Sequence, residues 1–225
     1  MTTTVPPLTQ ALLLAGKDLR LERRTGEALL VVAPFGAVAL LMVPLGVGAD
    51  TPLLRTLGPA LFWVVVLLFG VLVTVRGSAA DSPAQRAVLS LAGVTPRVRL
   101  AGRALGNTVL LLGFQAVVAP VAVVLYAPEP AGWFWLLPMV PLVAAGLGTL
   151  GALADQVSEG LAGRTVLGPL LVAPITVPLL LGATGVLDAT RYGRPAWPWL
   201  VLTVTVDLAA ALLAACCARH LEDQS

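Results

Sequence analysis

Long intervals without a charged residue recur along the whole chain, separated by short charged segments. A helix that crosses a membrane needs roughly 20 consecutive apolar residues, because each residue advances the helix by only about 1.5 Å. One acid, Asp207, interrupts the last interval, and the other intervals carry no charge. The pattern predicts six transmembrane helices, at about residues 28–48, 57–75, 105–126, 133–153, 165–187 and 197–217.

The composition excludes a water-soluble domain of the usual kind. Charged residues make up 12% of the 225 residues and hydrophobic residues 58%, with a mean hydropathy of +0.92. A soluble domain carries about 25% charged residues, so this chain has too few charges to cover its surface in water. We therefore expect residues 1–225 to form one all-α integral membrane domain in contact with the lipid bilayer. The net charge of +2 does not suggest a nucleic-acid partner.

The positions of the basic residues predict the orientation. If the N-terminus is cytoplasmic, all but three of the 14 Lys and Arg residues lie on the cytoplasmic side. The exceptions are Arg55, Arg191 and Arg194. Positive charge is enriched in cytoplasmic loops, so both termini are predicted to be cytoplasmic. Four tryptophans open the fourth and sixth predicted helices, as interfacial aromatic residues do, although stacking on a flat ligand is an alternative. They are Trp133, Trp135, Trp197 and Trp199.

The first 27 residues form a predicted cytoplasmic leader. Apolar residues at helical spacing over residues 8–25, followed by a basic cluster, favour a helix in the lipid headgroup layer. A plain solvated leader is the alternative. The apolar stretch precedes the basic residues, which is the reverse of a cleavable signal peptide.

The segment between the second and third predicted helices contains a short helix signal. Ser82, Pro83 and Gln85 match a capping box with proline at the first helical position, and Gly93 suits the position after the last turn. The signal predicts a cytoplasmic helix at about residues 83–92 with an apolar face. Such a helix fits a groove on a partner protein, and the alternative is a helix lying flat on the bilayer. The residues predicted to dock are Arg86, Val88, Leu89 and Leu91.

Few residues of this chain suggest catalysis or metal binding. The one lysine, Lys17, is not followed by Ser or Thr, so a phosphate-binding loop is excluded, and we expect no enzyme activity and no bound cofactor or metal. Cys216 and Cys217 are adjacent and make no redox motif, and His220 is the only histidine. Asp207 is an acid within a span. Such acids suggest a proton relay or an interior pair, whereas the structural alternative is a protonated acid that is hydrogen-bonded within the bundle.

Several blocks resemble the heme exporter protein B (CcmB) family, and in the same order along nearly the whole chain. A region after the second helix, residues 76–83, is poorer in charge than the family usually shows, and Asp207 matches no family feature. The matching blocks are residues 17–22 (KDLRLE), 51–63 (TPLLRTLGPALFW), 94–96 (VTP), 100–103 (LAGR), 161–167 (LAGRTVL), 174–178 (PITVP) and 188–189 (DA).

The resemblance implies a permease of ABC-2-type topology in the bacterial inner membrane that acts in cytochrome c-type biogenesis. It implies a separate CcmA-like ATPase subunit that binds ATP, CcmC-like and CcmD-like membrane subunits, and release of a heme-loaded CcmE-like chaperone. Heme is then handled by the complex, and a homodimer within the complex is possible. The alternatives are an ABC-2 permease for a drug or lipid, a membrane assembly scaffold without transport and, more remotely, a secondary transporter.

Overall fold

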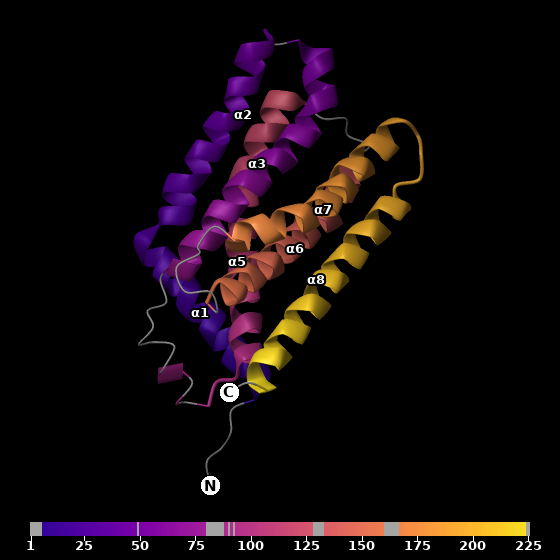
Figure 1. The fold of residues 1–225 in the computed structure, drawn as a ribbon. Helices are drawn as coiled ribbons and strands as arrows, with labels where there is room; N and C mark the ends of the chain where they lie inside the picture. The colour runs from indigo at the N-terminus through magenta and orange to yellow at the C-terminus, as the bar shows by residue number, and fades with distance from the viewer. Residues whose placement is uncertain are drawn as a thin grey trace.

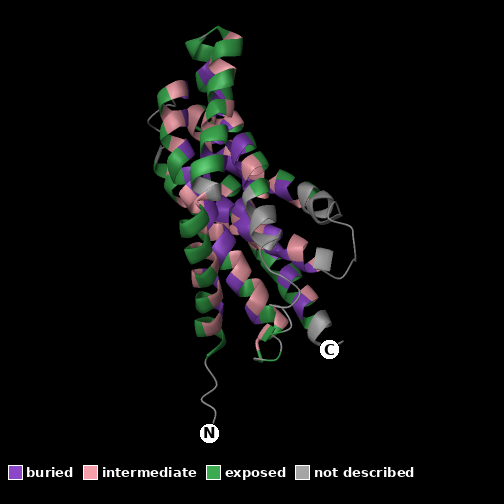
Figure 2. Ribbon diagram, turned by 90° about the vertical axis from the view of Figure 1, so that its left-hand side faces the viewer, coloured by how far each residue is buried: buried purple, intermediate pink, exposed green. Residues whose placement is uncertain are grey.

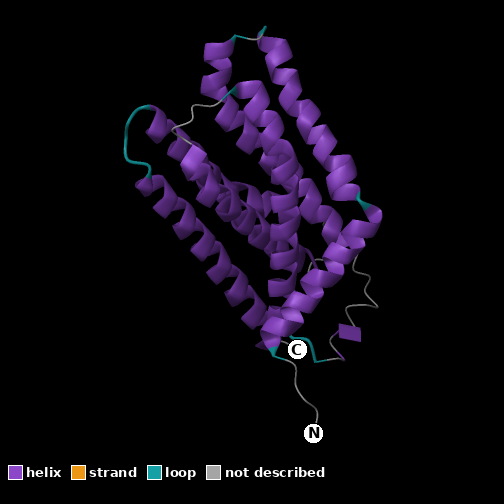
Figure 3. Ribbon diagram, turned by 180° about the vertical axis from the view of Figure 1, so that it is seen from behind, coloured by secondary structure: helices purple, strands orange, loops and turns teal. Residues whose placement is uncertain are grey.

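The computed structural model describes residues 6–48, 50–79, 88–89, 91, 93–127, 133–159 and 167–223. Within these ranges, it does not describe the side chains of residues 27–29, 73–79, 133, 158–159, 167–173 and 220–223. The described part is helical, with no strand (Figure 3). Its elements are α1 (Pro7–Thr25), the π-helix η1 (Glu27–Val32), α2 (Ala33–Val47), α3 (Thr51–Ala79), α5 (Pro96–Tyr126), α6 (Trp133–Glu159), α7 (Leu167–Arg191) and α8 (Trp197–Asp223).

Five helical segments within the described residues are long and apolar enough to cross a membrane. Together with the helical fold, they identify an all-α membrane protein, as the charge-free intervals predicted. Helix α7 covers most of the predicted fifth span but is not one of the five, so the count of six spans stays a prediction. The five are Leu30–Val47, Thr51–Leu72, Pro96–Tyr126, Phe134–Val157 and Trp197–Arg219.

Helix α5 lies at the centre of the bundle, where α1, α2, α3, α6 and α8 pack against it (Figure 1). The beginnings of α1 and α5 lie at the same end of the molecule as the end of α8, whereas α2 and α3 meet at the opposite end. This arrangement places both ends of the described chain together, and their cytoplasmic side remains a prediction. Buried residues line the inward faces of the helices, and exposed residues cover the outward faces (Figure 2).

The first predicted span does not begin as a regular α-helix. Helix α1 ends at Gly26, which adopts the left-handed conformation with φ 65° and donates its N–H to the carbonyl of Glu22. Six residues of π-helix follow before α2 begins. Glycine takes this conformation without the steric cost that a side chain imposes, so α1 and α2 become separate elements. Helix α1 packs along the first half of α5 through the buried Ala11 and Ala15.

A proline in α2 determines a contact between helices at the end of the bundle opposite to the chain ends. Pro44 has no N–H, so the carbonyl of Leu40, four residues earlier, loses its partner within the helix. The hydroxyl of Tyr126, at the end of α5, donates a hydrogen bond of 2.8 Å to that carbonyl. Both residues are buried, and a carbonyl in an apolar interior is costly without a partner.

We predict that Tyr126→Phe lowers the free energy of unfolding by about 1–2 kcal/mol, because it leaves the Leu40 carbonyl unsatisfied. Thermal unfolding of the purified protein in detergent measures the effect. Tyr192→Phe is the matched control, since Tyr192 is 62% exposed. Pro44→Ala restores an N–H to α2, so Tyr126→Phe should cost less in that background. An equal cost in both backgrounds would contradict the account.

Candidate functional site

The residues that the sequence predicts for partner docking do not all face the same way in the structure. Val88 and Leu91 are 63% and 88% exposed, whereas Leu89 is partly buried and faces the bundle. Arg86 lies outside the described residues. The surface offered to a partner by the described part of this segment therefore consists of Val88 and Leu91. The sequence could not show which of these side chains faces the bundle, because all three are apolar.

The docking segment, defined here as Val88, Leu89 and Leu91, lies close to the beginning of α5. Gly93 has a left-handed φ of 77°, and the N–H of Val94 donates to the carbonyl of Leu89 at 3.1 Å, as in a Schellman helix end. Thr95 then caps α5, because its hydroxyl accepts the N–H of Val98 at 3.4 Å. These two hydrogen bonds place Leu89 directly before the beginning of α5.

Leu89 is one wall of a half-open cavity of about 50 Å³ between three helices. The other walls come from α1, α5 and α6, so four parts of the chain meet around this space. Both charged and apolar groups face it. The lining residues are Leu14, Lys17, Asp18, Leu89, Arg99, Leu100, Arg103, Ala152, Asp155 and Gln156.

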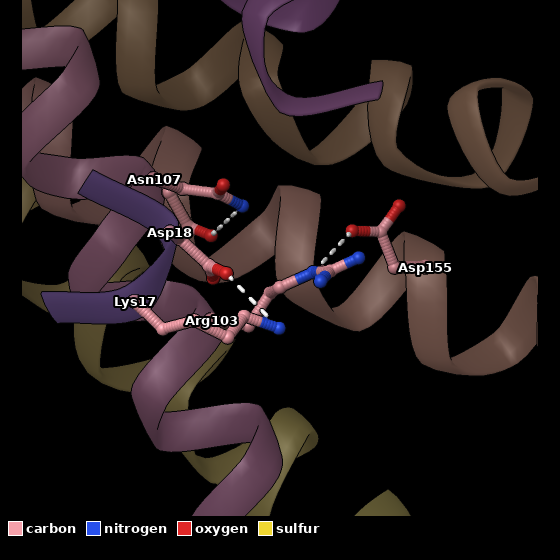
Figure 4. Close-up of polar contacts among 6 residues, drawn as sticks. Lys17, Asp18, Arg103, Asn107 and Asp155 are labelled. Carbon is pink, nitrogen blue, oxygen red and sulfur yellow. Dashed lines mark hydrogen bonds and ion pairs between the residues drawn. The ribbon is translucent and has the colours of Figure 1, made fainter. Parts of the chain in front are cut away.

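An ion pair connects α5 and α6 beside this cavity (Figure 4). The Nε of Arg103 lies 3.4 Å from Oδ2 of Asp155, and each side chain is only 13% exposed. On α1, the ammonium of Lys17 lies 3.5 Å from Oδ1 of the neighbouring Asp18. Charges that are partly withdrawn from water interact more strongly than exposed ones, and removing one partner is costly because the other charge remains.

The helices around the cavity approach one another at glycines. A Cβ on Gly148 of α6 would lie 2.5 Å from the hydroxyl oxygen of Thr108 on α5, and one on Gly102 of α5 would lie 3.0 Å from the carbonyl of Ala11. Asn107 adds a hydrogen bond of 3.4 Å from its amide to the carbonyl of Gly148. This close packing fixes α1 and α6 against the first half of α5.

The side chain of Asp207 points from α8 into the bundle, toward α6. Its carboxylate lies against Gly146, in a space that Leu179 of α7 also borders. Both carboxylate oxygens are buried, and neither has a hydrogen-bond partner among the described residues. The hydrogen bond expected for a structural acid is therefore not found in the described part. The role of Asp207 stays a prediction.

The remaining residues singled out from the sequence lie apart from the cavity. Trp197 and Trp199 are exposed, Trp135 is half-buried, and the side chain of Trp133 is outside the description. Cys216 and Cys217 are free thiols on α8. No group of three His, Cys, Asp or Glu side chains within the described residues is placed to hold a metal ion, and the side chain of His220 is not among them.

Asp207→Asn should change the free energy of unfolding much less than Asp155→Asn, because the carboxylate has no described partner to lose and the amide is a polar group of the same size. Asp155→Asn is the matched control, and it should be clearly destabilising since it breaks the ion pair with Arg103. Thermal unfolding in detergent compares the two variants. A loss at Asp207 as large as that at Asp155 would show that Asp207 has a partner.

Comparison with known proteins identifies the family of this chain. The model of the CcmB protein family matches residues 9–221. The heme exporter protein B of Paracoccus denitrificans is 30% identical over 200 residues, which cover 88% of this chain and 91% of the relative. The protein of the same name from Pseudomonas aeruginosa is 32% identical over 199 residues, covering 81% and 82%. That from Haemophilus influenzae is 28% identical over 183 residues, covering 80% and 81%. The match includes part or all of every described helix, and the chain belongs to the CcmB family.

Proposed function

We propose that this chain is the membrane permease subunit of a heme exporter that acts in cytochrome c-type biogenesis. The observation that carries the proposal is the family match over residues 9–221. Relatives that align over most of this chain are named heme exporter protein B. The all-helical membrane fold agrees with the role of a permease, because apolar helices form the lipid-embedded part of such a subunit.

In this proposal, ATP hydrolysis belongs to a separate CcmA-like ATPase subunit, and this chain is not itself catalytic. The sequence has no phosphate-binding loop, so the energy must enter through contact with a partner. The docking segment supports such a contact, since Val88 and Leu91 expose apolar side chains next to the basic beginning of α5. A short apolar helix face fits a groove on a second protein.

The complex would further contain CcmC-like and CcmD-like subunits in the bacterial inner membrane. Its ATP cycle would release the heme-loaded CcmE-like chaperone for cytochrome maturation outside. In this proposal, heme is handled by the complex as a whole, and no residue of this chain is assigned to bind it. An ABC-2 permease for a drug or lipid shares the fold, and an assembly scaffold would need no ATP turnover.

Deletion of the gene should abolish heme-stained c-type cytochromes, and the intact gene should restore them. The variant Leu91→Asp should restore about tenfold less heme-stained cytochrome than the intact gene, because an apolar contact with the ATPase is lost. The variant should still fold, because Leu91 is exposed in this chain. Heme staining of membranes and co-purification of the ATPase subunit measure the two effects.

Thr9→Asp is the matched control for this experiment, because Thr9 is an exposed polar residue on α1 and lies outside the docking segment. It should restore both cytochromes and ATPase binding. Unchanged c-type bands in the deletion strain would remove the heme-export function and leave a permease for another substrate. Normal ATPase binding by Leu91→Asp would place the docking surface elsewhere.

A further inference from the structure

The turn between α7 and α8 places two arginines around one tyrosine ring. The guanidinium carbons of Arg191 and Arg194 lie 5.9 Å and 5.2 Å from the centre of the Tyr192 ring. An aromatic ring attracts a cation that lies near its face, so Tyr192 holds both guanidinium groups in one small region. The turn lies at the beginning of α8, away from the end of the chain (Figure 1).

Neither arginine has an anionic partner among the described residues. Arg191 and Arg194 form no ion pair or hydrogen bond there through their guanidinium groups. Asp188 precedes Arg191 by three residues on α7, but the two side chains are not paired. Two like charges in one region repel each other, and an anion bound between them relieves the repulsion. The turn is therefore suited to bind an anion.

The backbone of this turn is ordered without a ligand. Gly193 has a left-handed φ of 64°, and its N–H donates to the carbonyl of Thr190 at 3.2 Å. The N–H of Arg194 donates to the carbonyl of Ala189 at 2.7 Å, as in a Schellman helix end. Ala189 and Ala196, on the two sides of the turn, are buried in the core. A ligand would bind without first having to order the backbone.

The turn adjoins the membrane-spanning part of α8, which begins at Trp197, three residues after Arg194. Trp197 is 61% exposed, whereas the indole of Trp199 packs against Gly185 of α7 and connects the two helices. Exposed tryptophans at the end of a span lie in the lipid headgroup layer. The arginines of the turn are therefore placed at the level of the lipid phosphates.

The side of the membrane on which this turn is predicted to lie makes the two arginines unusual. Two of the three basic residues predicted to be outside lie within this one turn. Because Lys and Arg are rare in short outer loops, a pair of them favours a specific role for the turn.

We propose that this turn is a binding site for the phosphate group of an anionic phospholipid. The planar guanidinium groups of Arg191 and Arg194 donate N–H bonds to the phosphate oxygens, and Tyr192 positions both groups. Trp197 offers an apolar surface to the beginning of the acyl chains. A zwitterionic lipid binds less well, because its own cation is repelled by the two arginines. The inference depends neither on the transported substrate nor on the ATPase.

Native mass spectrometry of the full chain in detergent tests the site with added phosphatidylglycerol or phosphatidylcholine of the same acyl chains. We expect the first phosphatidylglycerol to bind about tenfold more tightly than phosphatidylcholine. Arg194→Gln should weaken phosphatidylglycerol binding about tenfold, because a charge-assisted hydrogen bond is lost. Tyr192→Leu should weaken it similarly, whereas Tyr192→Phe keeps the ring and should bind normally. Thermal stability without added lipid should be unchanged, because Tyr192 and Arg194 are exposed.

Arg55→Gln is the matched control, because it removes the same charge from an exposed arginine near the beginning of α3. Arg55 is also predicted to be outside, and it contacts no aromatic ring among the described residues. This variant should bind phosphatidylglycerol normally.

Equal losses in Arg55→Gln and Arg194→Gln would show only a general attraction to negative charge, and would overturn the site. Equal binding of the two lipids by the unaltered chain would overturn it as well. Normal phosphatidylglycerol binding by Arg194→Gln would reject the lipid site and leave the arginines to an acidic protein partner. Displacement of the lipid by soluble glycerol phosphate would reject the membrane as the source of the phosphate group.

Discussion

The ion pair of Arg103 with Asp155 is the contact on which the arrangement at one end of the bundle depends. It joins α5 to α6 where the docking segment enters the structure, and both side chains are largely withdrawn from solvent. Such a pair contributes less to net stability than its geometry suggests, because desolvation of the two charges opposes their attraction. Its consequence is specificity of position. The pair forms only when α5 and α6 pack in a matching register, and the close contact of Gly148 with Thr108 is made in the same register.

The two ends of α5 are held by different chemistry. At the far end, the Tyr126 hydroxyl satisfies a carbonyl that Pro44 leaves open in α2, and the surroundings are apolar. At the near end, charged groups and a cavity surround the helix. A neutral hydrogen bond in an apolar core favours a fixed position, whereas charged groups around a cavity can exchange partners. The two ends of α5 therefore differ in kind: one is fixed by a neutral hydrogen bond in an apolar core, and the other is surrounded by charged groups.

The helices were predictable from the sequence because charge-free length is a local property. Thr95, Pro96 and Gly93 likewise mark the beginning of α5 and the preceding turn through their own backbone preferences. The inward direction of Leu89, the π-helix after Gly26 and the pairing of Arg103 with Asp155 were not predictable. Each depends on which helices become neighbours, and hydrophobic pattern does not specify neighbours in lipid, where every helix is apolar. For the same reason, the sequence singled out Asp207 but not Gln115 or Gln156, whose side chains carry buried polar atoms with no hydrogen-bond partner among the described residues.

The most direct test of the central claim is a disulfide cross-link across the cavity in the purified complex with its ATPase. Leu89→Cys and Ala152→Cys place thiols on two walls of the same cavity, in a background where Cys216 and Cys217 are replaced by serine. The account predicts that cross-linking yield differs between the nucleotide-free complex and the ATP-bound complex, because movement of the docking segment displaces Leu89 relative to α6. Equal yields in the two states would contradict the claim that force from the partner enters the bundle here.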